Sequence, residues 1–411
     1  MNTFYHGDCL FVLRNDIPPG SIDLIYLDPP FFTGQVQKGE WQPGAMEISF
    51  EDSKKFWKEK GLSIYAPDWL KHIAVKRPDF ASYLYYMMER LQACHKVLKN
   101  TATIYLHCDW RASHYLKMIM DEIFNDDNFR NEIIWYYKTG GISKRYFGRK
   151  HDIILMYSKT DDYKFSPQKE KSYLMHKYGF SNIQILKDEL GFYTEVGMRD
   201  VWDIPALRGN QPENMGYPTQ KPEALLRRII LASSTEGDLV LDPFCGCGTA
   251  IVVAHKLNRR WIGIDINRTA YDITKGREVQ MPIGLAEEFA KAKYISRDLE
   301  EVKELSPGSF ENWVNDFYLA EKPYPDKGVD GITPDGIPIQ VKAHKIGYKV
   351  LSQFLTDAKY HPNVAQPITK LLVVSQIGFD DGARQRKFEI ETTEGVEVML
   401  TTPEDMLKLE A

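Results

Sequence analysis

Apolar and polar positions along the chain form blocks that predict buried strands separated by amphipathic helices. The run 22–27 is apolar apart from Asp23 and predicts a buried strand. Similar short runs follow at 103–106, 133–136, 238–241 and 261–264. At 84–98 and 116–124 the apolar residues recur every three or four positions, which predicts helices. Strands that alternate with helices predict a mostly parallel, doubly wound α/β sheet, in which ligands bind beyond the carboxyl ends of the strands.

The first of these strands runs into Asp28-Pro29-Pro30-Phe31. Proline has no backbone N–H, so the carbonyls beside these two prolines lack a ladder partner and point outward. A carboxylate, a free carbonyl and a flat ring suit an amino group on a planar heterocycle, because the acceptors take its hydrogens and the ring stacks on its face. The structural alternative is a strand followed by a proline-stiffened turn. This stretch alone does not separate the two.

A second stretch favours the chemical interpretation. The strand at 238–241 leads into Asp242-Pro243-Phe244-Cys245-Gly246-Cys247-Gly248-Thr249, then a helix pattern, then a strand that ends at Asp265. This order is typical of a Rossmann-type nucleotide site. The turn lacks a third glycine at dinucleotide spacing, which predicts a ligand without a pyrophosphate. Cys245 and Cys247 are interpreted as small residues of a tight turn, because no second ligand pair follows at zinc-finger spacing.

Together these stretches resemble the amino-methyltransferases that use S-adenosylmethionine (SAM), over about residues 1–280. The Asp-Pro-Pro-Phe motif comes first, as in the β class of DNA amino-methyltransferases. The resemblance implies a Rossmann-like methyltransferase sheet with an inserted target-recognition region at about 139–215. It implies that Asp28, Pro29, Pro30 and Phe31 are catalytic. The residues it implies for SAM are Asp8, Lys221, Pro222, Asp242, Phe244, Gly246, Gly248, Thr249, Asp265 and Ile266.

Basic and aromatic residues are interleaved at 138–180. Such side chains can neutralise phosphates and stack on bases, although a charge-rich segment is often only a solvated face. The net charge is −5, so any contact with DNA needs a local patch of this kind. We therefore predict target recognition at 139–150 and 160–215, around a return strand at 151–157. The residues predicted to bind DNA are Lys144, Arg145, Arg149 and Lys150.

The roles of two further parts of the first 280 residues are not decided by the sequence. Residues 32–80 contain repeated glycines and prolines and are predicted to be irregular, closing over a flipped base or touching DNA. No residue in that stretch is assigned a role. His107 and Asp109 follow a predicted strand, where they either line the site or cap the next helix. Asp8 has the same two interpretations.

Beyond residue 282 the pattern changes. Asp330 lies on a predicted hairpin, and Gln340-Val341-Lys342 on the next strand resembles the PD-(D/E)XK nuclease superfamily in its Mrr-type branch. The resemblance implies a smaller α/β nuclease-like domain at 300–411, with Asp330 as the Mg²⁺ ligand and Gln340, Lys342 and Glu311 beside it. The second acid of the motif is replaced by Gln340, and Asp326 competes with Asp330 as the ligand. A charged hairpin on a DNA-binding or scaffolding appendage is the alternative.

Composition narrows the class of protein. A hydrophobic content of 43% with 27% charged residues fits a globular protein, and no run of 18 apolar residues or signal peptide is visible. Five cysteines, an odd number, fit a reducing compartment. We therefore expect a cytoplasmic protein with double-stranded DNA as its partner and no membrane association. A homodimer and a separate restriction subunit are further expectations.

The predicted function is methyl transfer from SAM to adenine-N6 in double-stranded DNA by a methyltransferase domain at 1–282, as part of a restriction–modification or DNA-modification system. Cytosine-N4 methylation is an alternative, although Ser is then more usual at the position of Asp28. Methylation of protein glutamine favours Asn there. A fused enzyme whose C-terminal domain cleaves DNA is the alternative from another class. Cytosine-C5 methylation is excluded because no cysteine follows a proline.

Overall fold

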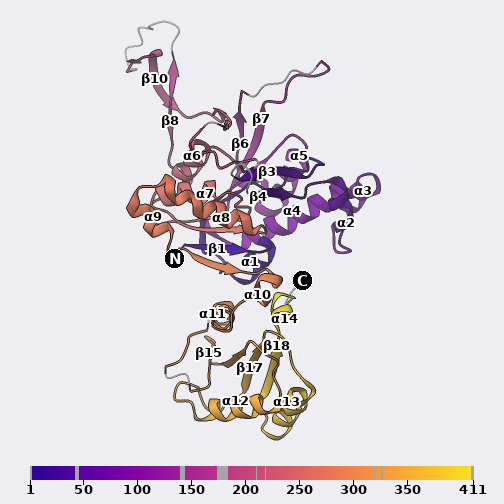
Figure 1. Ribbon diagram of the computed structural model, residues 1–411. Helices are drawn as coiled ribbons and strands as arrows, with labels where there is room; N and C mark the ends of the chain where they lie inside the picture. The colour runs from indigo at the N-terminus through magenta and orange to yellow at the C-terminus, as the bar shows by residue number, and fades with distance from the viewer. Residues whose placement is uncertain are drawn as a thin grey trace. The chain divides into compact units, whose positions relative to one another are not determined.

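The computed structural model describes residues 2–41, 46–138, 144–173, 184–209, 211–217, 219–318, 320–324 and 327–408. The chain forms two compact units, Met1–Tyr294 and Ile295–Ala411. In Figure 1 the first unit runs from indigo to orange and the second from orange to yellow. Of the helices in the described ranges, none has the length and apolarity that a membrane span requires.

A nine-stranded sheet is the centre of the first unit, as far as the described residues show. The strands β2, β5, β12, β13 and β1 are parallel, while β7 runs antiparallel to both β5 and β6. The predicted return strand is therefore confirmed. In order across the sheet the strands are β11 (Val201–Asp203), β6 (Phe129–Tyr136), β7 (His151–Ser158), β5 (Leu98–Cys108), β2 (Ile22–Leu27), β12 (Leu239–Asp242), β13 (Arg260–Asp265), β1 (Thr3–His6) and β14 (Lys293–Ser296).

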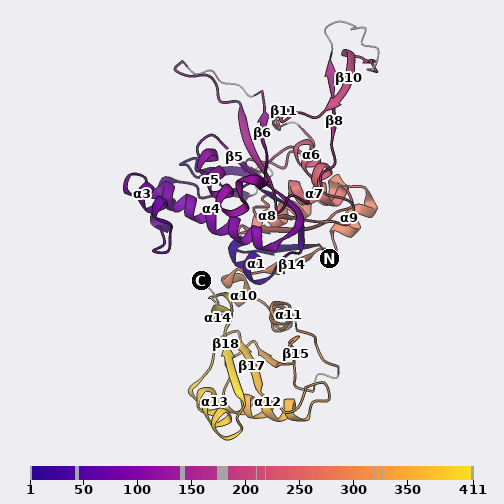
Figure 2. The ribbon, with the colours of Figure 1, turned by 180° about the vertical axis from the view of Figure 1, so that it is seen from behind.

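Helices cover both faces of this sheet (Figures 1 and 2). One face carries α1 (Cys9–Asn15), α4 (Pro78–Val97) and α5 (Ser113–Phe124), and the other carries α6 (Glu223–Ser233), α7 (Thr249–Lys256) and α8 (Arg268–Gly276). With both faces covered, β2 is buried along its whole length, which explains why its sequence is an almost uninterrupted apolar run. Short elements complete the unit: η1 (Asp126–Asn128), η2 (Arg277–Gln280) and α9 (Ile283–Phe289).

The prediction that 32–80 is irregular is wrong. The stretch contains the hairpin strands β3 (Gln37–Trp41) and β4 (Met46–Phe50) and the helices α2 (Lys54–Lys60) and α3 (Asp68–Lys76). Its glycines and prolines mark the ends of these short elements: Gly61 follows α2, Pro67 precedes α3 and Pro78 begins α4. Glycines and prolines that end several short elements lie close together in this sequence, and such a cluster resembles one long loop.

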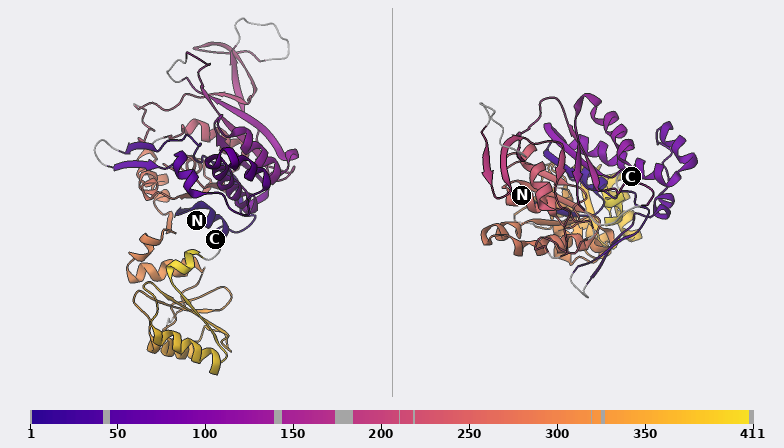
Figure 3. Two further views of the ribbon diagram at one scale, coloured as in Figure 1. Left: turned by 90° about the vertical axis from the view of Figure 1, so that its right-hand side faces the viewer. Right: turned by 90° about the horizontal axis from the view of Figure 1, so that it is seen from above.

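A small antiparallel sheet lies between β7 and α6 in the chain. It consists of β8 (Lys169–Tyr173), β10 (Gly191–Gly197) and β9 (Leu186–Asp188), in that order, and projects from the main sheet (Figures 1 and 3). The range predicted for target recognition also contains β11, which pairs with β6 in the main sheet. The insert is therefore tied back to the sheet before α6 begins.

The second unit contains a four-stranded sheet in the order β15 (Gly331–Ile332), β16 (Pro338–Lys342), β17 (Lys370–Ser375) and β18 (Glu397–Thr401). Strand β15 is antiparallel to β16, which gives the predicted hairpin, and the other pairs are parallel. Two buried apolar clusters are built on the sheet, one with Phe354 and Leu371 and one with Trp313 and Val341. The helices are α10 (Leu299–Lys303), α11 (Pro307–Phe317), α12 (Tyr348–Tyr360), α13 (Asp381–Thr393) and α14 (Pro403–Lys408).

Candidate active site

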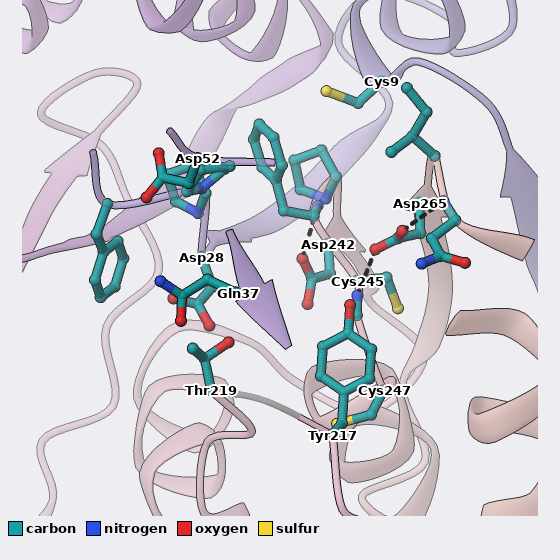
Figure 4. Close-up of a pocket in the computed structure, with 18 of the residues that line it drawn as sticks. Cys9, Asp28, Gln37, Asp52, Tyr217, Thr219, Asp242, Cys245, Cys247 and Asp265 are labelled. Atoms are coloured by element: carbon teal, nitrogen blue, oxygen red, sulfur yellow. Dashed lines mark hydrogen bonds between the residues drawn. The ribbon is translucent and has the colours of Figure 1, made fainter. Parts of the chain in front are cut away.

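Three neighbouring parallel strands of the first unit end at one cavity of 530 Å³ (Figure 4). Asp28 follows β2, Asp242 ends β12 and Asp265 ends β13, and these strands are adjacent in the sheet. All three carboxylates line the cavity. The sheet therefore brings together acids that are far apart in the sequence, at the edge where parallel sheets bind ligands.

The glycine turn between β12 and α7 adopts backbone conformations that other residues rarely take. Gly246 and Gly248 have φ values of 50° and 76°. A Cβ atom on Gly248 would lie 2.5 Å from the hydroxyl oxygen of Thr274, and one on Gly246 would lie 3.1 Å from the ring of Tyr217. Gly246 lines the cavity, so the turn presents bare backbone there, and a ligand can approach the chain closely. Cys245 and Cys247 are buried in the turn, and burial raises the pKa of both thiols.

Asp265 is held in place by the backbone around it. Its Oδ2 accepts a hydrogen bond of 2.7 Å from the N–H of Gly246, and its Oδ1 accepts one of 2.8 Å from the N–H of Asn267. Burial raises the pKa of Asp265, and these two backbone bonds oppose the rise. A carboxylate has about four acceptor positions, so two remain for a ligand. Ile266 beside it is 71% exposed at the cavity, which leaves an apolar surface available.

Asp28 forms an ion pair at the other end of the cavity. Its Oδ2 lies 2.5 Å from Nζ of Lys221, and the lysine also donates to the Thr219 carbonyl. The Lys221 ammonium lies 5.0 Å from the centre of the Phe31 ring. The resemblance placed Lys221 with the cofactor, and the structure shows it on the carboxylate of the Asp-Pro-Pro-Phe motif. Thr219 and Gln37 lie next to Asp28 in Figure 4.

The structure resolves the alternatives for His107, near the end of β5, and for Asp109, which follows that strand. Asp109 accepts a hydrogen bond of 2.8 Å from the N–H of Arg111 and pairs with its guanidinium, so it caps the following turn. His107 is completely buried, and its Nδ1 lies 3.9 Å from Oδ1 of Asp28. His107 therefore belongs to the surroundings of the motif, behind the wall of the cavity.

Asp8 has both of the roles considered for it, at the wall of the cavity and as a helix cap. It lines the cavity, and its Oδ1 caps α1 by accepting from the N–H of Leu10 at 2.7 Å. Arg90 of α4, which is buried, donates to both Asp8 oxygens at 2.7 and 2.6 Å. The guanidinium carbon of Arg90 lies 3.3 Å from the centre of the Tyr86 ring, and Tyr86 also lines the cavity. Asp8 is thus fixed before any ligand binds.

The sequence analysis missed a wall of the cavity that comes from the segment after β4 and from α2. Asp52, Phe56, Trp57 and Lys60 line it. The buried Asp52 accepts from the N–H of Thr33 at 2.6 Å and from Nε1 of Trp57 at 2.9 Å, so it ties α2 to the segment after Phe31. Burial raises the pKa of Asp52, and these bonds oppose the rise. The available signal was Ser53, whose hydroxyl caps α2.

The other residues implied for the cofactor lie close by. Phe244 and Thr249 line the cavity with the acids, whereas Pro222 is the N-cap residue of α6 and Gly248 that of α7. Pro29 and Pro30 line the cavity beside Asp28. The structure therefore places the motif of the first strand and the glycine turn around one space.

The basic residues predicted to bind DNA follow β6 and precede β7. The Arg149 guanidinium contacts two aromatic rings, 3.6 Å from the centre of Trp110 and 4.7 Å from that of Tyr146. Trp110 lies two residues after the end of β5, so these contacts lie at the same sheet edge as Asp28. Phe147 next to it is 98% exposed. Lys144 and Arg145 are exposed and Lys150 is half-buried.

In the second unit the residues of the nuclease-like motif come together around one oxygen. Oδ2 of Asp330 accepts from the N–H of Val341 at 2.7 Å, from the side-chain amide of Gln340, and from Nζ of Lys342 at 3.4 Å. Glu311 of α11 instead pairs with Lys322 at 2.5 Å. Asp326 lies outside the described residues. Within the described ranges, no group of three His, Cys, Asp or Glu residues is placed to hold a metal ion.

The sequence of this chain matches DNA methyltransferases. A model of the N6_N4 family, described as DNA methylase, matches residues 22–276. The DNA adenine methyltransferase YhdJ of Escherichia coli K12 is 32% identical over 296 residues, which are 71% of this chain and 87% of that protein. The type II methyltransferase M.BglII of Bacillus subtilis is 30% identical over 290 residues, 66% of this chain and 68% of its own. The solved PvuII DNA methyltransferase, described as cytosine-N4-specific, is 15% identical with a TM-score of 0.44, over 72% of this chain and 95% of its own.

Proposed function

Because this chain belongs to the N6_N4 DNA methylase family, we propose that it transfers a methyl group from SAM to the N6 amino group of adenine in double-stranded DNA. One observation carries the proposal: Asp28-Pro29-Pro30-Phe31 lines the same cavity as the glycine turn and Asp265. A target base and a methyl donor can then meet in one cavity. We infer that the reaction serves a restriction–modification or DNA-modification system.

Asp28 acts on the target amine. The lone pair of an aromatic amine is delocalised into the ring, so the nitrogen is a weak nucleophile. When Asp28 and the Pro29 carbonyl accept its two hydrogens, the nitrogen becomes more tetrahedral and its lone pair becomes available. Lys221 holds one oxygen of Asp28 at 2.5 Å, which keeps the carboxylate oriented. Phe31 stacks on the flipped base and offsets part of the few kcal/mol that unstacking costs.

The residues at the other end of the cavity fit SAM. Asp265 has free acceptor positions for the ribose hydroxyls, exposed Ile266 offers an apolar face to the adenine, and the Gly246–Gly248 turn admits a ligand against the backbone. Asp8, Phe244 and Thr249 complete this part of the wall. SAM would supply an electrophilic methyl group on a sulfonium, and the protein would supply position and orientation.

We prefer adenine to cytosine as the target. The first residue of the motif is Asp28, whereas cytosine-N4 enzymes more often carry Ser there, and the relative from E. coli is named an adenine methyltransferase. Methylation of protein glutamine, which favours Asn at this position, would leave the basic and aromatic segment around Arg149 unexplained.

The test is direct identification of the product. The purified protein is incubated with SAM and duplex DNA of mixed sequence. The DNA is then digested to nucleosides, which are separated by chromatography and identified by mass spectrometry. We expect N6-methyladenine, with N4-methylcytosine as the result that would replace the adenine assignment. An absence of methylated nucleosides on many DNA sequences, together with methylated glutamine in added protein, would overturn DNA as the substrate. Asp28→Asn is the matched control, because it keeps the size of the side chain and removes its charge.

DNA recognition is proposed for the insert and the segment before β7. Arg149 contacts the rings of Trp110 and Tyr146 at the edge that carries Asp28, and Lys144, Arg145 and Lys150 flank it. Cations held in this way neutralise phosphates beside the opened base pair. The small sheet β8–β10–β9 is proposed to contact the neighbouring duplex. A homodimer and a separate restriction subunit stay predictions.

For the second unit we propose a nuclease-like domain at about 300–411, next to a methyltransferase domain at about 1–282. The supporting observation is that Gln340 and Lys342, both on β16, converge on Asp330, which directly precedes β15. The fit to Mg²⁺ is incomplete, because the described residues supply one carboxylate whose Oδ2 already accepts three hydrogen bonds. The described residues therefore do not form a complete Mg²⁺ site. A DNA-holding appendage is the competing function.

One assay separates these two functions of the second unit. Full-length protein is incubated with methylated and unmethylated plasmid in Mg²⁺, Mn²⁺ or a chelator. A nuclease gives cleavage that needs the metal and is lost in Lys342→Ala while methylation continues. If no cleavage occurs with either metal, but Lys342→Ala weakens DNA binding, the unit is an appendage and the nuclease assignment fails.

A further inference from the structure

The side-chain amide of Gln37, the first residue of β3, lies at the end of the cavity that holds the Asp-Pro-Pro-Phe motif. Gln37 lines the cavity together with Asp28, Phe31 and Thr33. Its Nε2 donates to the hydroxyl oxygen of Thr33 at 2.8 Å, and Thr33 is only two residues beyond Phe31. In Figure 4 the amide lies beside the Asp28 carboxylate. Neither the motif nor the cofactor end of the cavity uses this amide.

A hydrogen-bond network determines which end of the amide faces Thr33. Both oxygens of Asp52 accept from N–H groups, Oδ2 from the Thr33 backbone at 2.6 Å and Oδ1 from Nε1 of Trp57 at 2.9 Å. The Thr33 hydroxyl donates to Oδ2 of Asp52 at 2.8 Å, and the Gln35 carbonyl is a more distant acceptor at 3.4 Å. A hydroxyl has a single hydrogen, so the Thr33 oxygen can only accept from Gln37. Nε2 of Gln37, and not Oε1, therefore faces Thr33.

The same network leaves part of the amide for a ligand. A primary amide has two N–H hydrogens and one acceptor oxygen, and Thr33 takes one of the hydrogens. The second hydrogen and Oε1 remain. The backbone that carries them is held as well, because Gln37 pairs with Phe50 across the β3–β4 hairpin. The cavity thus contains a donor of fixed orientation beside the catalytic motif, before any substrate binds.

We propose that Gln37 donates this second hydrogen to a ring nitrogen of the flipped adenine. The inference rests on the proposed function, because it needs a target base in the cavity. Asp28 and the Pro29 carbonyl take the two amino hydrogens, and both groups only accept. The ring nitrogens N1 and N7, which flank the amino group, are acceptors and need a donor from another residue. Glutamine is a usual partner of the N6/N7 edge of adenine in DNA recognition.

The contact affects the choice between adenine and cytosine. Cytosine has an acceptor, N3, on one side of its amino group, in the place of N1 of adenine. On the other side it has a C–H group at position 5, where adenine has N7. A donor to N1 would hold either base, whereas a donor to N7 would favour adenine. A site that bonds a polar atom of its substrate rejects an analogue without that atom, because its own donor is left unpaired.

The test uses adenine analogues that lack one ring nitrogen and keep the amino group. The target adenine of a methylated duplex is replaced by 7-deazaadenine or by 1-deazaadenine, and kcat/KM is measured for wild type and for Gln37→Met. Methionine keeps much of the length of glutamine and removes its donor and acceptor. We expect the wild type to lose about 2- to 12-fold on one analogue, the range of one neutral hydrogen bond. Gln37→Met should methylate that analogue and adenine equally well, which cancels any intrinsic difference in reactivity between the bases.

The analogue that shows this loss identifies the nitrogen, N7 or N1, that Gln37 contacts. Gln35→Met is the matched control, because Gln35 is exposed, lies two residues away and is not among the residues that line the described cavity. It should keep the wild-type ratios. Thermal unfolding and SAM affinity, expected to be unchanged in Gln37→Met, show that this variant is folded.

Thr33→Val provides a second test that does not depend on the folding of Gln37→Met. It removes the hydroxyl that orients the amide, so the ratio of adenine to the sensitive analogue should fall toward one. The proposal is overturned if the wild type loses nothing on either analogue, or if Gln37→Met keeps the wild-type ratios on both. A wild-type protein that methylates no adenine in any duplex would instead refute the proposed function.

Discussion

Asp28 and Asp330 are two carboxylates in similar local settings with different surroundings. Each lies beside a strand and next to a lysine, at 2.5 Å from Lys221 and 3.4 Å from Lys342. Asp28 also lines a cavity to which β12 and β13 contribute their ends. Asp330 collects three donors on one oxygen, all of them from the hairpin strand β16. A short motif can thus place an acid beside a lysine, but a substrate site needs other strands to converge on it.

Removal of the Asp28 carboxylate is the strongest test of this difference between Asp28 and Asp330. Asp28→Ala should reduce methylation by about 10³-fold or more, because the charged acceptor for the amine is lost. SAM affinity should be unchanged, since Asp28 contacts the target. Single-turnover methylation and titration calorimetry measure the two effects. A folded variant that no longer binds SAM would place Asp28 in the cofactor site.

Lys221→Met separates the position that the resemblance implied for this lysine from the one that the structure shows. Methionine keeps much of the length and removes the charge, so Asp28 loses a charge-assisted partner worth about 1.5–3 kcal/mol. We expect the methylation rate at saturating SAM to fall roughly 10- to 150-fold, with little change in KM for SAM. If the KM for SAM rises and the rate at saturation stays normal, Lys221 belongs to the cofactor.

Asp265 tests the other end of the cavity. Asp265→Ala should weaken SAM binding by about 1.5–3 kcal/mol, because a buried ribose loses a charged acceptor. Burial raises the pKa of Asp265, so wild-type SAM affinity should decline as the pH falls, starting above the usual range of an aspartate. Asp265→Asn should bind weakly at every pH. Unchanged SAM affinity in Asp265→Ala would remove this residue from the site.

The site could be predicted from sequence where local pattern decides the structure. Strands β2 and β13 are buried runs that end in acids, and Gly246 and Gly248 mark a turn that other residues cannot form. Pairs of side chains that are far apart in the sequence leave no such local sequence pattern. Lys221 and Asp28 are 193 residues apart, and Arg90 and Asp8 are 82 apart, so only the folded sheet brings them together.

The error at 32–80 has a different physical origin. Glycine and proline end helices as often as they form loops, and α2 has only seven residues, too few for a clear helical period. Trp57 stabilises that short helix by packing on Tyr83 of α4, a tertiary contact that sequence periodicity does not reveal. The wall of the cavity that α2 provides was therefore missed.

A smaller effect is expected at the basic segment. Arg149→Gln with Lys150→Gln should reduce the slope of log affinity against log salt by about 1.8, since each phosphate contact contributes about 0.9. The matched control is Lys96→Gln with Arg260→Gln, two exposed cations near the amino-terminal ends of the strands. Affinities for duplex DNA at several salt concentrations measure both slopes. Equal slopes in the two double variants would move the DNA contact away from Arg149.

The smallest effect on methylation is expected at the second carboxylate. Asp330→Ala removes the acceptor of the Val341 N–H and of the Gln340 amide, which should destabilise the second unit by about 1–3 kcal/mol because those donors remain partly buried. Methylation should change by less than about twofold, because none of the residues lining the described cavity belongs to this unit. Thermal unfolding and single-turnover methylation measure the two quantities on one sample, with Glu321→Ala as a control at a residue that bridges to Ile332 of the hairpin. If Asp330→Ala unfolds at the wild-type temperature, the three hydrogen bonds do not stabilise the hairpin, and Asp330 becomes more comparable to Asp28, a carboxylate kept for a ligand.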